Sequence, residues 1–379
     1  MASSERVRRV TTPAGDPAWL VTTYADVKLL LSDLRLGRSH PDPDRAPRYT
    51  DTAIFGRPVG SPDTERADHA RMRALLTRSF SAKRMELLRP RVQELANQLV
   101  DDMLRQSPPV DLHAALSFPL PVLVICELLG VPSEDRHRFS QWSADAADMT
   151  DARRSQAGWS QLFGYMLELL GRKRQQAAED VISDLLTAQA HDPALTNHAI
   201  AQLAAGLLFA GHETTVAAID RGVVLLLTNP AQWAALQHER SVIQSAVEEV
   251  LRSPDPVQPA DVASPGGLPR YANADIEVDG VRIASGELVL LALHQANVDT
   301  AVFARPDAFD VQRVENPHMT FGHGSHYCIG APLARIELQV VFETLARRVP
   351  TLRLAGSVAE LRPKSHLLTG GLVELPVSW

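Results

Sequence analysis

The stretch from Phe321 to Gly330 combines a rare thiol with three glycines, a setting that suits a metal-binding thiolate. Cys328, in this stretch, is one of only two cysteines among the 379 residues of the chain. Pro332 follows in a helix-like run, where its missing N–H costs nothing in the first turn. Cys328 would then precede a helix N-terminus, whose free N–H groups and dipole stabilise a thiolate. Because glycines also let a flat group approach the main chain, the loop fits a thiolate-ligated haem iron.

Two other interpretations of this loop require no haem. A lone cysteine is most often a small buried hydrophobe with an inert thiol. His323, His326 and Cys328 could alternatively bind zinc, but a structural zinc site needs a fourth ligand. The chain has no second cluster of cysteine and histidine with the spacing of such a site, so zinc is the weaker alternative.

The pattern F-x-x-G-x-H-x-C-x-G, followed by A-x-L-A-R, closely resembles the haem-ligand loop of the cytochrome P-450 family. The resemblance extends over nearly the whole chain and implies one domain, residues 1–379, of mainly α (α+β) class. In that fold a large helical lobe accompanies a smaller β-rich lobe, with haem buried between a long central helix and the cysteine loop. The resemblance implies that Cys328 binds the iron of haem b and that His326 helps to bind the cofactor.

A long apolar helix is predicted from Thr196, a good N-cap, to the break before Pro230, about 50 Å at 1.5 Å per residue. A glycine, a carboxylate and a hydroxyl interrupt its apolar centre at Gly211, Glu213 and Thr214. A carboxylate buried there would be costly without a function. The string A-G-x-E-T-T resembles the family's oxygen-activation motif. By that resemblance Glu213 relays protons, Thr214 donates a hydrogen bond to bound dioxygen, and Gly211 leaves room for the flat cofactor.

Basic side chains form a second candidate binding set. His69 and Arg73 are four residues apart in a basic helix predicted over Glu65 to Phe80, so they share one face. On the residues alone, a solvated face is the simpler interpretation. The pair also resembles the family's H-x-x-x-R, whose side chains bind the haem propionates, and Arg270 matches a further propionate-binding arginine.

Three charged residues are expected to lock the structure near the cysteine loop. Glu249 and Arg252 are three apart on one helical face, a pair worth little if exposed. In the resembled family such a pair is buried with a later arginine, which Arg313 matches. We interpret the three as structural and not catalytic.

Periodicity and turn residues predict the remaining elements. Helices are expected over residues 24–32, 84–106, 114–129, 133–149 and 154–176, a hairpin over 276–283, and strands over 19–22, 288–293, 352–354 and 367–377. Two proline-rich loops are expected over residues 39–62 and 254–269. The resemblance implies that the first caps the substrate pocket, and the second, which is longer than in the family, is expected to border the pocket and shape substrate choice.

The overall composition is that of a globular cytoplasmic protein. Hydrophobic residues make up 45%, charged residues 22%, and the net charge is −7, which gives no basic excess for binding nucleic acid. Two cysteines suit a reducing compartment. The N-terminus carries no apolar signal region, and no apolar run is long enough to span a membrane. We expect a cytoplasmic monomer that binds neither nucleic acid nor membrane.

The resemblance implies a monooxygenase that hydroxylates or epoxidises a small organic substrate with O2. A polyketide or macrolide-type secondary metabolite is the first guess, from the likeness to bacterial tailoring enzymes. Since the chain has no flavin or iron–sulfur fingerprint, electrons should come from a separate ferredoxin and its reductase. A docking face for that acidic donor is expected from four basic residues: Arg71, Arg78, Lys83 and Arg335. The alternatives are a peroxide-driven or other non-monooxygenase haem–thiolate enzyme, and a haem carrier or sensor.

Overall fold

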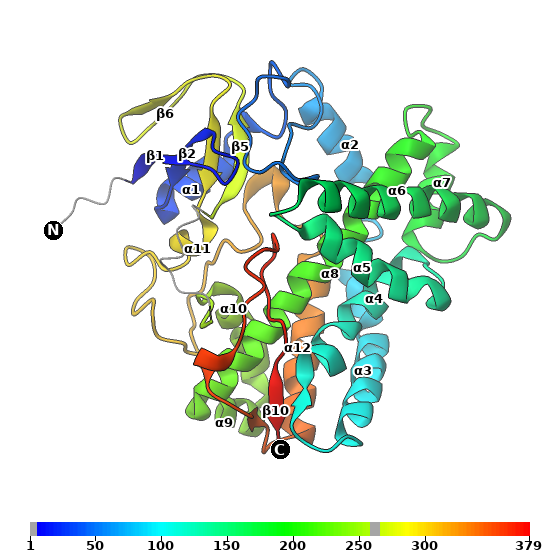
Figure 1. Ribbon diagram of the computed structural model, residues 1–379, viewed down its shortest axis with the longest axis vertical. Helices are drawn as coiled ribbons and strands as arrows, with labels where there is room; N and C mark the ends of the chain where they lie inside the picture. The colour runs from blue at the N-terminus through cyan, green and yellow to red at the C-terminus, as the bar shows by residue number, and fades with distance from the viewer. Residues whose placement is uncertain (1–5, 258–265) are drawn as a thin grey trace. The chain divides into compact units, whose positions relative to one another are not determined.

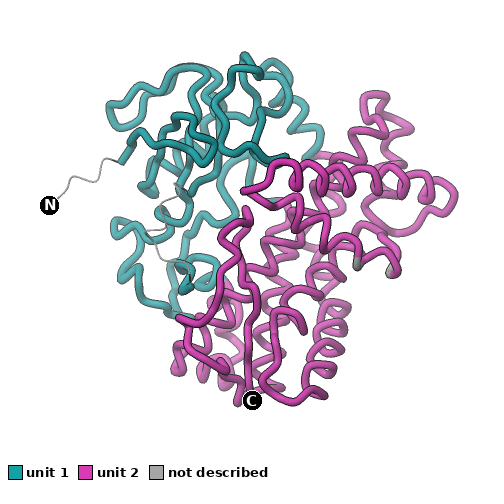
Figure 2. The backbone as a smooth tube through the Cα atoms, in the orientation of Figure 1, with its two compact units in different colours: residues 1–73, 248–328 teal, residues 74–247, 329–379 magenta. Residues whose placement is uncertain are grey.

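The computed structural model describes residues 6–257 and 266–379. The chain divides into two compact units, residues 1–73 with 248–328 (unit 1) and residues 74–247 with 329–379 (unit 2), as Figure 2 shows. The single domain 1–379 therefore stays a prediction. Much of the proline-rich stretch 254–269, expected beside the substrate pocket, falls at residues 258–265, outside the described residues.

Unit 1 is built on a five-stranded sheet with the order β1-β2-β8-β5-β3 (Figure 1). All neighbouring strands are antiparallel except β2 and β8, which run parallel. The strands are β1 (Val7–Thr11), β2 (Pro17–Val21), β8 (Leu288–Leu291), β5 (Leu268–Ala272) and β3 (Leu36–Gly37). The predicted strands over 19–22 and 288–293 are thus confirmed as two neighbours in one sheet.

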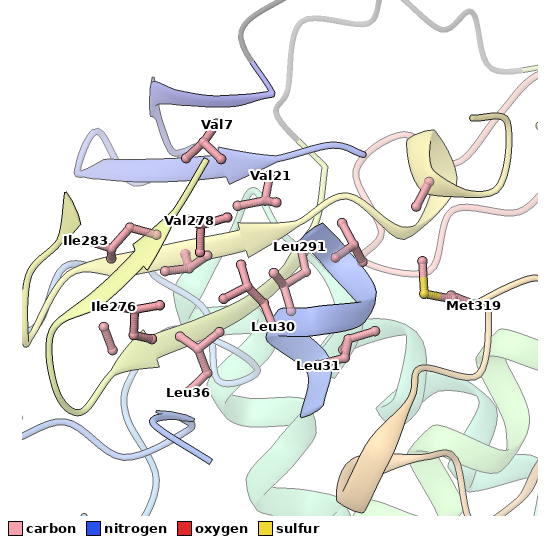
Figure 3. Close-up of a cluster of buried hydrophobic side chains, with 14 residues drawn as sticks. Val7, Val21, Leu30, Leu31, Leu36, Ile276, Val278, Ile283, Leu291 and Met319 are labelled. Atoms are coloured by element: carbon pink, nitrogen blue, oxygen red, sulfur yellow. The ribbon is translucent and has the colours of Figure 1, made fainter. Parts of the chain in front are cut away.

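Helix α1 (Tyr24–Ser32) supplies the apolar side chains that complete the core of unit 1 (Figure 3). Thr23 caps the helix by accepting a hydrogen bond from the N–H of Asp26, and the helix bounds match the prediction. Val27 and Leu30 lie in one buried cluster with Leu291. This core fixes the end of α1, against which the cysteine loop rests.

The predicted hairpin over 276–283 is confirmed as β6 (Ile276–Val278) and β7 (Val281–Ile283). Asp279 and Gly280 form its two-residue turn with φ of 50° and 74°. Two positive φ angles in succession are typical of a type I′ turn, which matches the twist of the strands. A short helix, α11 (Leu293–Ala296), follows β8.

Unit 2 is mainly helical. Its helices are α3 (Ala82–Leu104), α4 (Pro119–Leu129), α5 (Arg136–Ala147), α6 (Ala152–Gln175), α7 (Val181–Gln189), α8 (Asn197–Thr228), α9 (Pro230–His238) and α12 (Ala331–Arg348). Two further helices, α2 (Glu65–Thr77) and α10 (Ile243–Arg252), cross the boundary between the units. A three-stranded sheet joins β4 (Val110–Asp111), β10 (Pro376–Ser378) and β9 (Arg353–Leu354). Mainly α (α+β) is therefore the correct class.

Helix α8 has the bounds that the sequence predicts. Thr196 caps it through the N–H of Ala199, and it ends at Thr228, two residues before Pro230. Most of its residues are buried, and it packs on α4 and α6 within unit 2. Such a helix holds Glu213, at its centre, away from bulk water.

Two predictions in unit 2 are partly wrong. The helix expected over 114–129 is interrupted, because His113–Ser117 form a π-helical turn and α4 begins only at Pro119. Proline at a first helical position has no N–H to offer the preceding turn, so a new helix begins there. In the tail, the strand expected over 352–354 is confirmed as β9, but of the strand expected over 367–377 only the end lies in β10, and residues 367 and 372 make isolated bridges.

The predicted charged lock is confirmed within unit 1. Arg252 donates from Nε and Nη2 to both oxygens of Glu249, each at 2.8 Å, and Arg313 Nε donates to Glu249 Oε2 at 3.0 Å. Glu249 and Arg252 are fully buried. Burial by itself would raise the pKa of Glu249, but these donors and the N–H of Asp310 outweigh it and lower that pKa. The carboxylate thus stays ionised between its partners.

A Glu249→Ala variant is expected to lose about 3–5 kcal/mol of unfolding free energy, because it leaves buried guanidinium groups without their counter-charge. Urea denaturation followed by circular dichroism measures the change. The control is Glu277→Ala, an exposed glutamate of β6 in the same unit, for which less than about 0.5 kcal/mol is expected. Equal effects of the two substitutions would contradict the lock.

Candidate active site

The cysteine loop of unit 1 is shaped by glycines in the left-handed region. Gly322 and Gly324 have φ of 74° and 71°, and Cys328 N–H donates to Phe321 O at 2.8 Å, which closes the loop. A Cβ on Gly324 would lie 2.9 Å from the carbonyl oxygen of Leu31 in α1, so no other residue fits without a shift. The close approach to α1 holds the loop that carries the exposed thiol of Cys328.

The two cysteines have opposite environments. Cys126 is fully buried in α4, and burial raises the pKa of its thiol to about 12. A thiol in that state provides no thiolate near neutral pH. Cys328 is exposed and lies three residues before the first residue of α12. Among the two, Cys328 is therefore the candidate metal ligand.

Cationic side chains gather beside the cysteine loop, all within unit 1. The imidazole rings of His69 and His326 stack with centroids 3.9 Å apart and an angle of 34°. Arg73 Nη1 donates to the carbonyl oxygen of Tyr327 at 2.9 Å. The structure thus brings His69, Arg73 and His326 together, as the sequence predicts for residues of a single binding site.

Burial and neighbouring positive groups lower the pKa values of this cluster. Burial, followed by the charges of His69 and Arg270, lowers the pKa of His326 to about 4. Burial, followed by the charge of Arg38, lowers the pKa of Arg270 to about 10. Positive groups whose pKa values fall in this way repel one another, and a bound negative charge would stabilise their charged forms. A group with two carboxylates, such as the propionates of haem, fits this donor set.

The sequence interpretation missed Arg38 and Glu65 in this cluster. Glu65 accepts hydrogen bonds from the N–H of Arg38 at 2.6 Å, from the N–H of Ser39 at 3.0 Å, and from the hydroxyl of Ser39. Burial would raise the pKa of Glu65, but these donors outweigh it and lower that pKa. Glu65 precedes His69 by four residues on one helical face, a spacing that could have drawn attention to it. Nothing in the sequence marks Arg38, which arrives from the segment after β3.

A separate group of candidate residues lies on α8 in unit 2. Glu213 is buried with 9% of its surface exposed, and this burial raises the pKa of its carboxyl. The positive charges of Lys364 and His113 oppose that rise in part. Thr214, the next residue, is exposed, and its hydroxyl donates to the carbonyl oxygen of Ala210 at 2.9 Å. A buried acid thus lies next to an accessible alcohol.

Gly211 has a packing role that the sequence did not indicate. A Cβ built on it would lie 2.8 Å from Cδ1 of Ile125 in α4. The glycine therefore lets α4 and α8 approach closely. The expectation that Gly211 also makes room for the cofactor stays a prediction.

A metal site of other composition finds no support in the described residues, 6–257 and 266–379. Among them, no group of three or more histidine, cysteine, aspartate or glutamate side chains is placed to hold a metal ion. The same residues include no helix that is both long and apolar enough to cross a membrane.

Comparisons with known proteins identify the relatives of the chain. The family described as "Cytochrome P450" matches residues 139–349. Pentalenolactone synthase of Streptomyces exfoliatus is 43% identical over 370 residues, which cover 97% of this chain and 91% of that protein. Mycinamicin IV hydroxylase/epoxidase of Micromonospora griseorubida is 41% identical over 382 residues, which cover 100% of this chain and 94% of the relative.

Solved structures agree with these relationships. A variant of the mixed-function P450 MycG in complex with mycinamicin IV has a TM-score of 0.85 and 41% identity, covering 100% of this chain and 94% of that one. CYP105P1 in complex with filipin I has a TM-score of 0.87 and 35% identity, covering 99% and 93%. These TM-scores show that the chain has the fold of the two solved proteins, and the identities show that the sequences are related.

Proposed function

Because this chain belongs to the cytochrome P450 family, and is therefore a monooxygenase with haem held by a cysteine thiolate, we propose that it hydroxylates or epoxidises a polyketide or macrolide-type secondary metabolite. The likeness to the mycinamicin IV hydroxylase/epoxidase over the whole chain supports this class of substrate. Macrolide substrates are large and mainly apolar, so shape more than charge would select among them.

The residues present fit the implied cofactor. We propose that Cys328 is the thiolate ligand and that His69, Arg73, Arg270 and His326 bind the two propionates. The stacked imidazoles and the lowered pKa of Arg270 support the second assignment, since bound carboxylates would relieve the repulsion. When bound, haem supplies the redox chemistry of dioxygen activation, and the protein supplies position and protons.

The buried acid beside an exposed alcohol on α8 is the observation that carries the proposal of O2-dependent chemistry. Dioxygen can be split productively only if protons arrive where it binds. Because burial raises the pKa of Glu213, this carboxyl holds its proton to a higher pH than an exposed glutamate does. Thr214 can pass that proton on, since a hydroxyl both donates and accepts. A carrier or sensor would have no need of this pair.

Spectral titration of the oxidised holoenzyme with a panel of macrolides, other polyketides, terpenes and steroids tests the substrate class. A ligand in the productive position displaces water from the iron and shifts its spin state. Reconstitution with a ferredoxin, its reductase and 18O2 then shows whether oxygen from O2 enters the product. Spin shifts confined to terpenes or steroids would contradict the macrolide class.

We also propose that electrons come from a cytoplasmic ferredoxin and its reductase, with Arg78 and Lys83 in the docking face. Both side chains are exposed, Arg78 just after α2 and Lys83 at the start of α3. Ferredoxins of this kind are acidic, so long-range attraction would speed their encounter with a basic face.

The double variant Arg78→Glu/Lys83→Glu is expected to raise the KM for ferredoxin about tenfold at low salt, because it reverses two charges at the docking face. Steady-state turnover at a series of ionic strengths measures this effect, which should shrink as salt screens the charges. The exposed Arg105→Glu serves as the control, because Arg105 lies at the other end of α3, about 33 Å along the helix from Lys83. An unchanged KM in the double variant would rule out this docking face.

A further inference from the structure

A second group of titratable side chains lies on α8 within unit 2, apart from Glu213 and Thr214. His113 Nδ1 is 2.7 Å from Asp220 Oδ2, and Lys364 Nζ is 3.1 Å from His113 Nε2. His113 comes from the π-helical turn, Asp220 from α8 and Lys364 from the C-terminal segment. Three segments distant in the sequence thus contribute one residue each to a continuous chain of contacts.

The chemistry of the groups fixes the direction of these hydrogen bonds. A lysine ammonium can only donate, so His113 Nε2 accepts from Lys364. The proton of a neutral His113 ring is then on Nδ1, from which it is donated to Asp220. Donation therefore runs in one direction, from a half-buried amine to a fully buried carboxylate.

The inner end of this chain lies on the same helix as the acid of the proposed mechanism. Glu213 and Asp220 are seven residues apart on α8, which is two turns, so both lie on one face about 10 Å apart along the axis. The charge of Lys364, and that of His113 in its protonated form, act on Glu213 and on the neighbouring His212.

Two buried polar atoms, one at each end of this part of α8, have unused hydrogen-bonding capacity. Among the described residues, Asp220 Oδ1 and His212 Nε2 have no hydrogen-bond partner. Both residues are nine-tenths or more buried, and His212 Nδ1 is 3.4 Å from Glu213 Oε1. Buried polar atoms of this kind are usually satisfied by internal water, which also conducts protons.

We propose that Lys364, His113 and Asp220 form a proton-uptake relay that returns a proton from solvent to Glu213 after each turnover. In each cycle an N–H bond of Lys364 breaks as one forms on His113 Nε2, and the Nδ1–H bond breaks as an O–H bond forms on Asp220. Internal water carries the proton from Asp220 to Glu213, and Lys364 regains one from solvent. The starting tautomer of His113 returns when its ring turns, releases the Nε2 proton to internal water and takes up another at Nδ1. This inference rests on the proposed role of Glu213 as the acid.

The alternative is that the trio only anchors the C-terminal segment to α8. Lys364→Arg separates the two roles, because arginine keeps the charge and the donor but does not give up a proton near neutral pH. Lys364→Met removes both. An anchor predicts that arginine behaves as the wild type does, whereas a relay predicts that both variants are impaired.

The measurement is the rate at which the Glu213 carboxyl of the holoenzyme exchanges hydrogen for deuterium, followed by rapid-mixing infrared spectroscopy. The band of Glu213 is the protonated-carboxyl band that disappears in Glu213→Gln. Glu337 of α12 is an internal reference, since complete burial raises the pKa of its carboxyl well above the usual value. We expect exchange at Glu213 to slow at least about tenfold in both Lys364 variants, with Glu337 unchanged.

Two results would overturn the relay, and they are distinguishable. If the band of Glu213 is present and Lys364→Arg exchanges as fast as the wild type, the relay is wrong and Glu213 remains the acid. If Glu213→Gln removes no band, Glu213 holds no proton. The proposed role of Glu213 as the acid and the proposed relay are then both wrong. His113→Gln, which keeps one hydrogen bond but does not transfer a proton, should reproduce the slow exchange of Lys364→Arg.

Discussion

Replacing Cys328 by alanine is expected to abolish the thiolate signature of the haem and all O2-dependent turnover. The reason is the contrast between the two cysteines, since the buried Cys126 thiol has a pKa of about 12 and supplies no thiolate. Without the sulfur ligand, the electron density that favours O–O cleavage is lost. The absorption spectrum of the reduced protein under carbon monoxide measures thiolate ligation directly.

Cys126→Ala is the matched control for this experiment. It removes the other sulfur from a buried position in α4 and is expected to lower stability by about 1 kcal/mol, with spectrum and turnover unchanged. If Cys328→Ala keeps the thiolate signature, or if Cys126→Ala loses it, the assignment of the ligand is wrong.

A Glu213→Gln variant is expected to lose about 10²–10⁴-fold of its substrate turnover, because the amide cannot supply the proton that a positioned acid gives. Thr214→Ala should lose a comparable factor, since the hydroxyl next to the acid is removed. In both variants the haem should stay bound with its thiolate signature, and O2 should be consumed without product. Product formation and O2 consumption, measured side by side, give the fraction of productive turnover.

Thr215→Ala is the matched control for the alcohol. Its hydroxyl donates to the carbonyl oxygen of Gly211 at 3.4 Å, as that of Thr214 does to Ala210, but Thr215 is buried. Turnover should stay within about twofold of the wild type, because no proton transfer is assigned to this hydroxyl. Equal losses in the two threonine variants would indicate a general disturbance of α8 in place of a specific proton donor.

The pH dependence of turnover follows from the same burial. The acid is active while protonated, and its raised pKa keeps it protonated to a higher pH than usual. Turnover should therefore fall as pH rises through the pKa of Glu213. This limb of the pH–rate profile should be absent from Glu213→Gln.

Features determined by local chemistry could be predicted from the sequence. The bounds of α1 and α8 follow from the caps Thr23 and Thr196, and the type I′ turn follows from the pair at Asp279. The lock around Glu249 was also found, although only the family resemblance showed that this pair is buried and has Arg313 as its partner.

Features that depend on long-range contacts were missed, because no local pattern records them. Arg38 and Glu65 meet through backbone N–H donors that carry no sequence signal. Lys364 reaches His113 from 251 positions along the chain, and neither residue stands in a recognisable motif. Gly211 was interpreted as leaving room for the cofactor. Its close contact with Ile125 follows from the packing of α4 on α8, which the sequence does not record.

If the stacked histidines and the buried Arg270 of unit 1 bind the cofactor as proposed, the cofactor is part of what keeps the chain folded. A cofactor held by His69, His326 and Arg270 in the native state alone would add about 2.7 kcal/mol to stability at a hundredfold excess over its Kd. A cell starved of iron would then lose this protein to proteolysis as well as to inactivity, so its abundance would report on porphyrin supply.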